Sequence, residues 1–168
     1  MSRSDARLAR EVVLALVAVE PRHGWALHRE LAPTGSVGRA WSLSRQLTYR
    51  AIDALVDEGL ARRSAPREGQ GGDRLVISAT GSGRRHCASW LDAPVEHLRD
   101  VRTELVVKIM LREMHDLPLQ EFVRDQRRVF EPLIAAVTAA NDGSPVGSWR
   151  AESAESVRRW LERLSRDA

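Results

Sequence analysis

Apolar residues recur at helical spacing along most of the chain and predict a mainly α-helical protein. Between residues 8 and 19 they occur on nearly every side, which predicts a buried first helix that ends before Pro21. A short second helix is expected at residues 23 to 31. Residues 32 to 44 are rich in Gly, Ser and Pro and form a linker, within which residues 39 to 41 are expected to pair as a short strand with a later hairpin.

The clearest amphipathic pattern lies between residues 44 and 60. Its apolar face repeats every four residues and comprises Leu47, Ala51 and Leu55, widened by Ile52 and Val56. Its polar face comprises Arg45, Gln46, Tyr49, Arg50 and Asp53. Ser44 is expected to cap the start of this helix, and Gly59 is expected to stop its end.

Two short strand-like runs follow, at residues 61 to 79, around a Gly-rich turn flanked by arginines. A helix with a polar face followed by a basic hairpin is the plan of a winged helix-turn-helix. The fold class expected is therefore mostly α, with a small β-hairpin wing. Ser78 is the expected N-cap of a fourth helix, which would reach about Leu91.

Pro94 suggests a boundary between two domains. Residues 1–92 would form the winged helix-turn-helix DNA-binding domain, and residues 93–168 an α-helical domain for dimerisation and effector binding. In the second domain we expect one helix through residues 98 to 109 and an approximate heptad through residues 119 to 137, which Pro132 should kink or split. After a loop at residues 141 to 148, a last apolar stripe is expected at Trp149, Ser153, Val157, Trp160 and Leu164.

Charge is unevenly distributed along the chain. The net charge is only +3, but residues 1–92 carry 14 Arg against 10 acidic residues, whereas residues 93–168 carry 12 basic against 13 acidic residues. The basic excess thus lies in the half with the helix-turn-helix pattern. One cysteine excludes an intramolecular disulfide, and with no signal-peptide pattern and no apolar run of membrane-spanning length, a cytoplasmic protein is expected.

DNA is the ligand that these patterns favour. The candidate contacts on the amphipathic helix are Ser44, Arg45, Gln46, Tyr49 and Arg50. Arginine can bind guanine and glutamine can bind adenine through paired hydrogen bonds, while tyrosine more often contacts phosphate. A solvated helix face is the alternative interpretation, which the neighbouring basic hairpin disfavours.

Further DNA contacts are expected beside that helix. In the hairpin turn they are Arg67, Gln70 and Arg74, since glycine allows close approach to the sugar-phosphate backbone and arginine adds charge; a flexible tip is the alternative. His23 opens the second helix, whose N–H groups could meet a phosphate, and a simple cap is the alternative there.

Tryptophan offers flat faces for an aromatic effector, and the candidates are Trp90, Trp149 and Trp160. Core packing or a dimer interface is the commoner use of such residues. Cys87 is expected to be a packed thiol, with a redox role as the alternative. Because no metal-ligand spacing and no catalytic constellation is visible, we expect no metal, no cofactor and no enzymatic activity.

Several segments resemble the PadR family of bacterial transcriptional regulators. They are PRHGWALHREL at residues 21 to 31, LTYRAIDALVDEGL at 47 to 60, RLVISATG at 74 to 81, WLDAP at 90 to 94 and RTELVVKIML at 102 to 111. The resemblance implies a homodimer joined by its C-terminal helices, which acts on double-stranded DNA, usually as a repressor, and in many members responds to a small aromatic or hydrophobic effector. An interaction module with weak or lost DNA binding is the alternative function.

Overall fold

α-Helices carry most of the chain, as the apolar spacing predicts. The computed structural model describes residues 3–65 and 75–167. The chain divides into two compact units, Met1–Asp92 and Ala93–Ala168. The elements of the first unit are α1 (Arg3–Val19), β1 (Arg22–His23), α2 (Gly24–Leu31), α3 (Arg45–Asp57), β2 (Ala61–Ser64), β3 (Val76–Ala79) and α4 (Gly81–Asp92). Those of the second are η1 (Leu98–Asp100), η2 (Val101–Leu105), α5 (Val106–Met114), α6 (Leu119–Ala139) and α7 (Pro145–Asp167).

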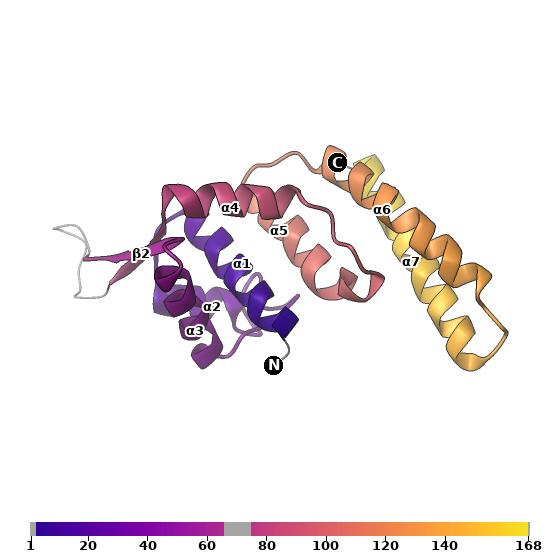
Figure 1. Cartoon of the computed structure of the whole chain (residues 1–168), viewed down its shortest axis with the longest axis horizontal. Helices are drawn as coiled ribbons and strands as arrows, with labels where there is room; N and C mark the ends of the chain where they lie inside the picture. The colour runs from indigo at the N-terminus through magenta and orange to yellow at the C-terminus, as the bar shows by residue number, and fades with distance from the viewer. Residues whose placement is uncertain (1–2, 66–74, 168) are drawn as a thin grey trace. The chain divides into compact units, whose positions relative to one another are not determined.

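Helix α1 forms the centre of the first unit. It packs against α3 and α4, and α2 packs against α3 (Figure 1). Six consecutive α1 residues are fully buried: Val12, Val13, Leu14, Ala15, Leu16 and Val17. A helix that is apolar on every side must be covered on every side, which explains why the other elements of this unit gather around it.

The small sheet has the order β1-β3-β2 and is antiparallel throughout. The prediction that residues 39 to 41 pair with the wing is wrong, because β1 takes that place, with Arg22 opposite Ile77. Residues 39 to 41 lie in turns and a bend. Their linker is anchored to the end of α2 instead, where Gly38 N donates to Glu30 O (2.9 Å) and Leu43 N donates to Leu31 O (2.8 Å).

Both predicted ends of α3 are confirmed. The Ser44 hydroxyl accepts a hydrogen bond from Leu47 N, and Gly59 follows the helix with φ of +68°. The predicted cap of α4 is wrong, because Ser78 lies within β3. Thr80 caps that helix, and its hydroxyl accepts a hydrogen bond from Gly83 N at 3.0 Å.

The helix expected at residues 98 to 109 is not uniform. It begins as a 3-10 turn in η1, continues as the π-helical turn η2 and becomes α-helical in α5. Helix α6 in turn is continuous through Pro132, so of the kink or split expected there, the split is wrong. Pro132 and Arg128 are both exposed, and water can therefore satisfy the carbonyl that loses its helical partner at the proline.

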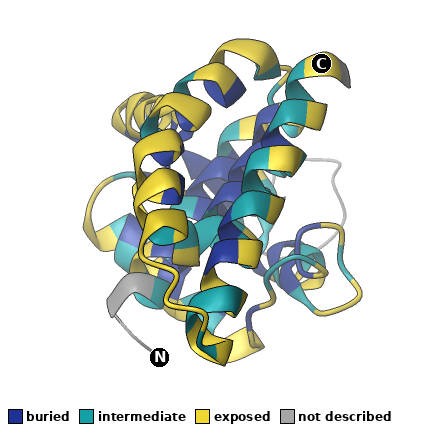
Figure 2. Cartoon of the chain, turned by 90° about the vertical axis from the view of Figure 1, so that its right-hand side faces the viewer, coloured by how far each residue is buried: buried dark blue, intermediate teal, exposed yellow. Residues whose placement is uncertain are grey.

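Helices α6 and α7 pack on each other as a hairpin, with buried residues on one side of each helix and exposed residues on the other (Figure 2). On α7 the buried residues are Ala151, Ala154 and Leu161. The predicted stripe is wrong at its start, because α7 begins at Pro145 and Trp149 is 72% exposed. Ala151 and Ala154 are small and let α6 approach closely near the start of α7. The helix contact therefore runs through these alanines and not through Trp149.

Polar side chains hold the first residues of the second unit. The Lys108 ammonium is buried and donates to Ala93 O at 2.7 Å. The fully buried Gln126 amide donates to Val95 O at 2.8 Å and accepts from Val95 N at 2.7 Å. The segment from residue 93 to 95 is therefore fixed to α5 and α6 by its backbone.

Candidate nucleic-acid interface

The exposed face of α3 carries the predicted DNA contacts. Its apolar residues Ala51, Ile52 and Leu55 are buried, and this fixes which side of the helix faces outward. Of the candidates, Ser44, Arg45, Gln46 and Arg50 are exposed, and Tyr49 is half-buried. The structure thus brings the candidates at the start of α3 onto one polar surface.

Ser44 acts first as a structural cap. Its hydroxyl lies 3.3 Å from the Leu47 nitrogen that it caps, and its carbonyl accepts hydrogen bonds from both the nitrogen and the hydroxyl of Thr48. The side chain is nevertheless exposed. A contact from Ser44 to DNA would therefore have to share an oxygen that already stabilises the helix start.

Tyr49 joins α3 to the start of α2. A Cβ placed on Gly24 would lie 3.0 Å from three atoms of the Tyr49 side chain, so a larger residue there would push the Tyr49 ring aside by a few tenths of an ångström. The Arg45 guanidinium lies over the Tyr49 ring, 5.7 Å from its centroid. Tyr49 is thereby held between two helices, and Arg45 is held one turn before it.

His23 connects α2 to the base of the wing. It lies in β1, directly before α2, and its side chain does not cap that helix. Its Nδ1 lies 3.3 Å from the carbonyl oxygen of Leu75. Because a carbonyl can only accept, Nδ1 carries the proton in this hydrogen bond. His23 is therefore the N-cap residue of α2, as the alternative expected, but its side chain makes no capping hydrogen bond and instead joins the helix to the base of the wing.

Two arginines on β2 belong to the same surface and were not singled out in the sequence. Arg63 forms an ion pair with Asp53 of α3, and Arg62 Nε donates to the Ser78 hydroxyl at 3.2 Å. Both side chains are exposed on a strand whose only buried residue is Ala61. The available signal was the run of three polar residues after Ala61, which is typical of a strand at the edge of a sheet.

A hollow of about 620 Å³ opens beside α3. Its lining includes Trp25 at the start of α2, Tyr49 and Arg45 on α3, and Leu75 and Ile77 at β3. Trp25 is 50% exposed. The hollow forms because the fold brings residues 23 to 25 beside residues 75 to 77. No local sequence pattern indicates it.

Arg45 and Arg50 differ from Arg10 and Arg63 of the same unit, which form ion pairs with Glu58 and Asp53. Within residues 3–65 and 75–167, neither Arg45 nor Arg50 has a carboxylate at ion-pair distance. Their positive charges are therefore open to solvent, and both lie in the N-terminal half of α3. A positive, exposed helix face beside a basic strand attracts the phosphates of a nucleic acid.

The remaining predicted contacts cannot be placed on this surface. Arg67, Gln70 and Arg74 lie outside the described residues. The three tryptophans expected at an effector site belong to separate helices: Trp90 lies half-buried on α4, while Trp160 packs partly against the core of the second unit and Trp149 is exposed, both on α7. None of the three lines the 620 Å³ hollow.

The described part of the chain contains no group of three or more His, Cys, Asp or Glu side chains placed to hold a metal ion. Among its helices, none combines the length and the apolar character needed to cross a membrane.

In fold and surface, the first unit is a winged helix-turn-helix, with α2 and α3 as the helix pair and β2 and β3 as the strands of the wing. No protein-family model matches the chain, and no curated protein matches it either. Solved structures are similar over nearly its whole length.

One such structure is Bacillus subtilis PadR in complex with operator DNA, which is 16% identical with a TM-score of 0.47 and covers 93% of this chain and 97% of that one. PadR in complex with p-coumaric acid is 17% identical with a TM-score of 0.46 and covers 98% and 97%. The Vibrio cholerae virulence activator AphA is 20% identical with a TM-score of 0.43 and covers 95% and 96%. The similar structures thus include PadR, after which the family that the motifs resemble is named. At these identities and TM-scores the likeness carries no conclusion about what this chain binds.

Proposed function

We propose that the protein is a PadR-like transcriptional regulator that represses its target genes by binding a pseudo-palindromic operator as a homodimer. The observation that carries this proposal is the exposed polar face of α3, where Arg45 and Arg50 have no carboxylate partner among the described residues. A positive helix face of this kind raises the local concentration of an anionic ligand such as DNA.

The start of α3 would enter the major groove of DNA. Arg45 and Arg50 suit the paired acceptors of guanine, and Gln46 suits adenine. Tyr49, held against Gly24, would present its hydroxyl to a phosphate. Arg62 on β2 would add backbone contacts, since its exposed side chain stands on the adjoining strand. Base contacts would then supply sequence choice, while phosphate contacts would supply affinity and salt dependence.

The second unit would supply the dimer contacts. Its helices α6 and α7 leave large apolar side chains open to solvent, with Val146 67% and Trp149 72% exposed. A second copy of the chain would remove such surface from water. Two recognition helices related by a two-fold axis would then meet half-sites about 10 bp apart, or a multiple of that spacing.

Release from the operator by a small aromatic or hydrophobic effector completes the proposal. A ligand that binds one spacing of the two DNA-binding units better than another would need a coupling of roughly 1–3 kcal/mol. Trp90, Trp149 and Trp160 remain the residues predicted for such a ligand site in the helical regions. Screening aromatic compounds by thermal stability and DNA affinity tests this part, and it is abandoned when no compound shifts either quantity.

The test of DNA binding is a fluorescence-anisotropy titration of the purified protein with the DNA upstream of its own gene. Excess competitor DNA and a series of salt concentrations accompany the titration. We expect saturable binding that survives the competitor and weakens steeply with salt. Binding that disappears with competitor on this fragment and in a genome-wide selection would contradict the proposal and favour a protein-interaction module.

A further inference from the structure

Arg63 and Asp53 form an ion pair that joins β2 to the polar face of α3. The Arg63 guanidinium donates through one nitrogen to Oδ1 of the Asp53 carboxylate. The Arg63 and Asp53 side chains keep 36% and 58% of their surface open. Asp53 follows Tyr49 by four residues and Arg50 by three, which are the spacings of neighbours on one side of a helix. The carboxylate therefore stands beside the candidate base contacts and within reach of a large ligand.

One oxygen of that carboxylate has no partner. Within residues 3–65 and 75–167, the contact with Arg63 involves Oδ1 of Asp53, and no hydrogen bond or ion pair reaches Oδ2. An ionised carboxylate only accepts hydrogen bonds, so Oδ2 can bind only a donor. Because Arg63 holds the other oxygen, rotation of the carboxylate is restricted. The free oxygen is therefore an oriented acceptor on the surface of α3.

The major groove of DNA presents donors and acceptors in a pattern that a carboxylate can distinguish. Cytosine offers its N4 amino group as a donor, whereas guanine offers the acceptors O6 and N7, and thymine offers the acceptor O4. Adenine offers an N6 amino donor beside its N7 acceptor. An acceptor that faces Oδ2 would repel it. A carboxylate in the groove therefore favours cytosine.

The negative charge of Asp53 is offset by its partner. A lone carboxylate in the groove is repelled by the phosphates on both sides of it. The pair of Asp53 with Arg63 is neutral as a whole, whereas Asp57, the other acidic residue of α3, has no basic partner among the described residues. Asp53 can therefore approach DNA at a smaller electrostatic cost than Asp57.

We propose that Asp53 reads a cytosine in the operator, with Arg63 as the positioning residue that orients and neutralises its carboxylate. The inference rests on the proposed function, in which α3 enters the major groove. Asp53 lies eight residues after Arg45, or about 12 Å along the helix at a rise of about 1.5 Å per residue. That distance spans about three or four base pairs at roughly 3.4 Å each, which gives the separation between this cytosine and the guanine that Arg45 binds.

Selection from a pool of random DNA duplexes, followed by sequencing, tests this base contact with the full-length protein. In the wild type we expect a cytosine preference of about fivefold or more at one position of each half-site. Asp53→Ala should lose that preference and keep those at the other positions. Asp53→Asn should select adenine there instead, because an amide both donates and accepts. Arg45→Ala marks the guanine from which the separation is counted.

Asp57→Ala is the matched control, since it removes the same charge from an exposed position one turn further along α3. It should leave every base preference unchanged. Arg63→Ala should weaken the cytosine preference and also lower the affinity for DNA of every sequence, which fluorescence anisotropy measures. Arg63→Lys should restore part of both. A merely structural role of Arg63 would lower the affinity and leave the preference unchanged.

Three results would overturn the inference: a cytosine preference that survives in Asp53→Ala, no gain of adenine in Asp53→Asn, or equal changes of base preference in Asp53→Ala and Asp57→Ala. In each of these cases a wild type that still selects a site keeps the proposed function. A wild type that selects no sequence at all refutes the proposed function together with the inference, so the two failures are distinguishable.

Discussion

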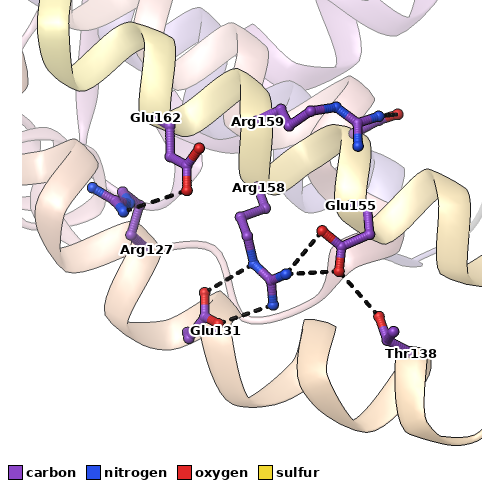
Figure 3. Close-up of polar contacts among 8 residues, drawn as sticks. Arg127, Glu131, Thr138, Glu155, Arg158, Arg159 and Glu162 are labelled. Atoms are coloured by element: carbon purple, nitrogen blue, oxygen red, sulfur yellow. Dashed lines mark hydrogen bonds and ion pairs between the residues drawn. The ribbon is translucent and has the colours of Figure 1, made fainter.

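The polar side chains of α3 and those of the α6–α7 hairpin differ in what surrounds them. On the hairpin, the Arg158 guanidinium binds both Glu131 and Glu155, at 2.9 Å and 2.6 Å, and Arg127 lies 3.9 Å from Glu162 (Figure 3). On α3, Arg45 and Arg50 face solvent without such partners in the described residues. Arg158 thus holds two helices together, whereas Arg45 and Arg50 leave their charges open to solvent.

This difference shows why net charge alone is a weak guide to function. A chain of net charge +3 can present a strongly positive surface when its acidic residues are already paired elsewhere. What matters is which arginines lack a carboxylate, and only the fold reveals that.

The strongest test of this difference is to remove the two arginines of α3 that lack a carboxylate partner. We expect Arg45→Ala with Arg50→Ala to lose about 1–3 kcal/mol for each base contact, or at least about 30-fold in specific affinity. DNA titration measures this loss, and circular dichroism checks the fold. Arg124→Ala with Arg163→Ala, two exposed arginines of the second unit that likewise have no carboxylate at ion-pair distance in the described residues, is the matched control and should bind normally. Equal losses in both variants would mean that DNA binding follows total charge.

The next largest effect should come from a paired polar group inside the second unit. Gln126→Leu leaves the nitrogen and the oxygen of Val95 buried without their partner, which costs about 1–3 kcal/mol for each group. Urea unfolding measures the free energy. Gln120→Leu, at an exposed position of the same helix, should change it by no more than about 0.5 kcal/mol. Equal free energies of unfolding for the two variants would show that the hydrogen bonds between Gln126 and Val95 do not stabilise this unit.

A smaller effect is expected from the ion pairs on the hairpin surface. Arg158→Ala should lower stability by about 1 kcal/mol or less, since exposed ion pairs contribute little and salt screens them. The loss should shrink in high salt, and DNA binding should remain at the wild-type level. A DNA defect in Arg158→Ala, with unchanged stability, would assign this arginine to a ligand as well.

The smallest effect concerns the interior of the first unit. Burial, and secondarily the charge of Glu11, raise the pKa of the Cys87 thiol from 9.0 to about 12. Because the folded pKa exceeds the unfolded one, the stability from the neutral thiol is complete below pH 9.0 and is lost as the pH rises toward 12.

At pH 8, iodoacetamide should therefore alkylate native Cys87 at least about 100-fold more slowly than the unfolded protein. Mass spectrometry over time measures this ratio. Comparable rates in the two states would instead support a redox role for the thiol.

The sequence predicted the elements that carry strong local signals. The helix at α3 and both its ends were correct because its apolar spacing, its serine cap and its glycine stop all agree. The third strand of the sheet was misplaced because β1 has only the two residues Arg22 and His23, too few for any alternation to appear. Its existence depends on pairing with a strand more than 50 positions later in the chain.

Other features depended on tertiary contacts as well. The cap of α4 moved from Ser78 to Thr80 because strand pairing continues to Ala79, and both residue types make good caps. The exposed polar side of α3 followed from amphipathicity alone. The hollow at Trp25, and the neutralisation of Arg63 by Asp53, could not be predicted because both join segments that are distant in sequence.

The hydrogen bonds of Lys108 and Gln126 to the backbone of Ala93 and Val95 also limit the length of chain that is free between the two units. Helix α4 ends at Asp92, and the carbonyl of the next residue, Ala93, is already bound. The residue that follows α4 is thus already tied into the second unit, so the free length of chain between the two units is short.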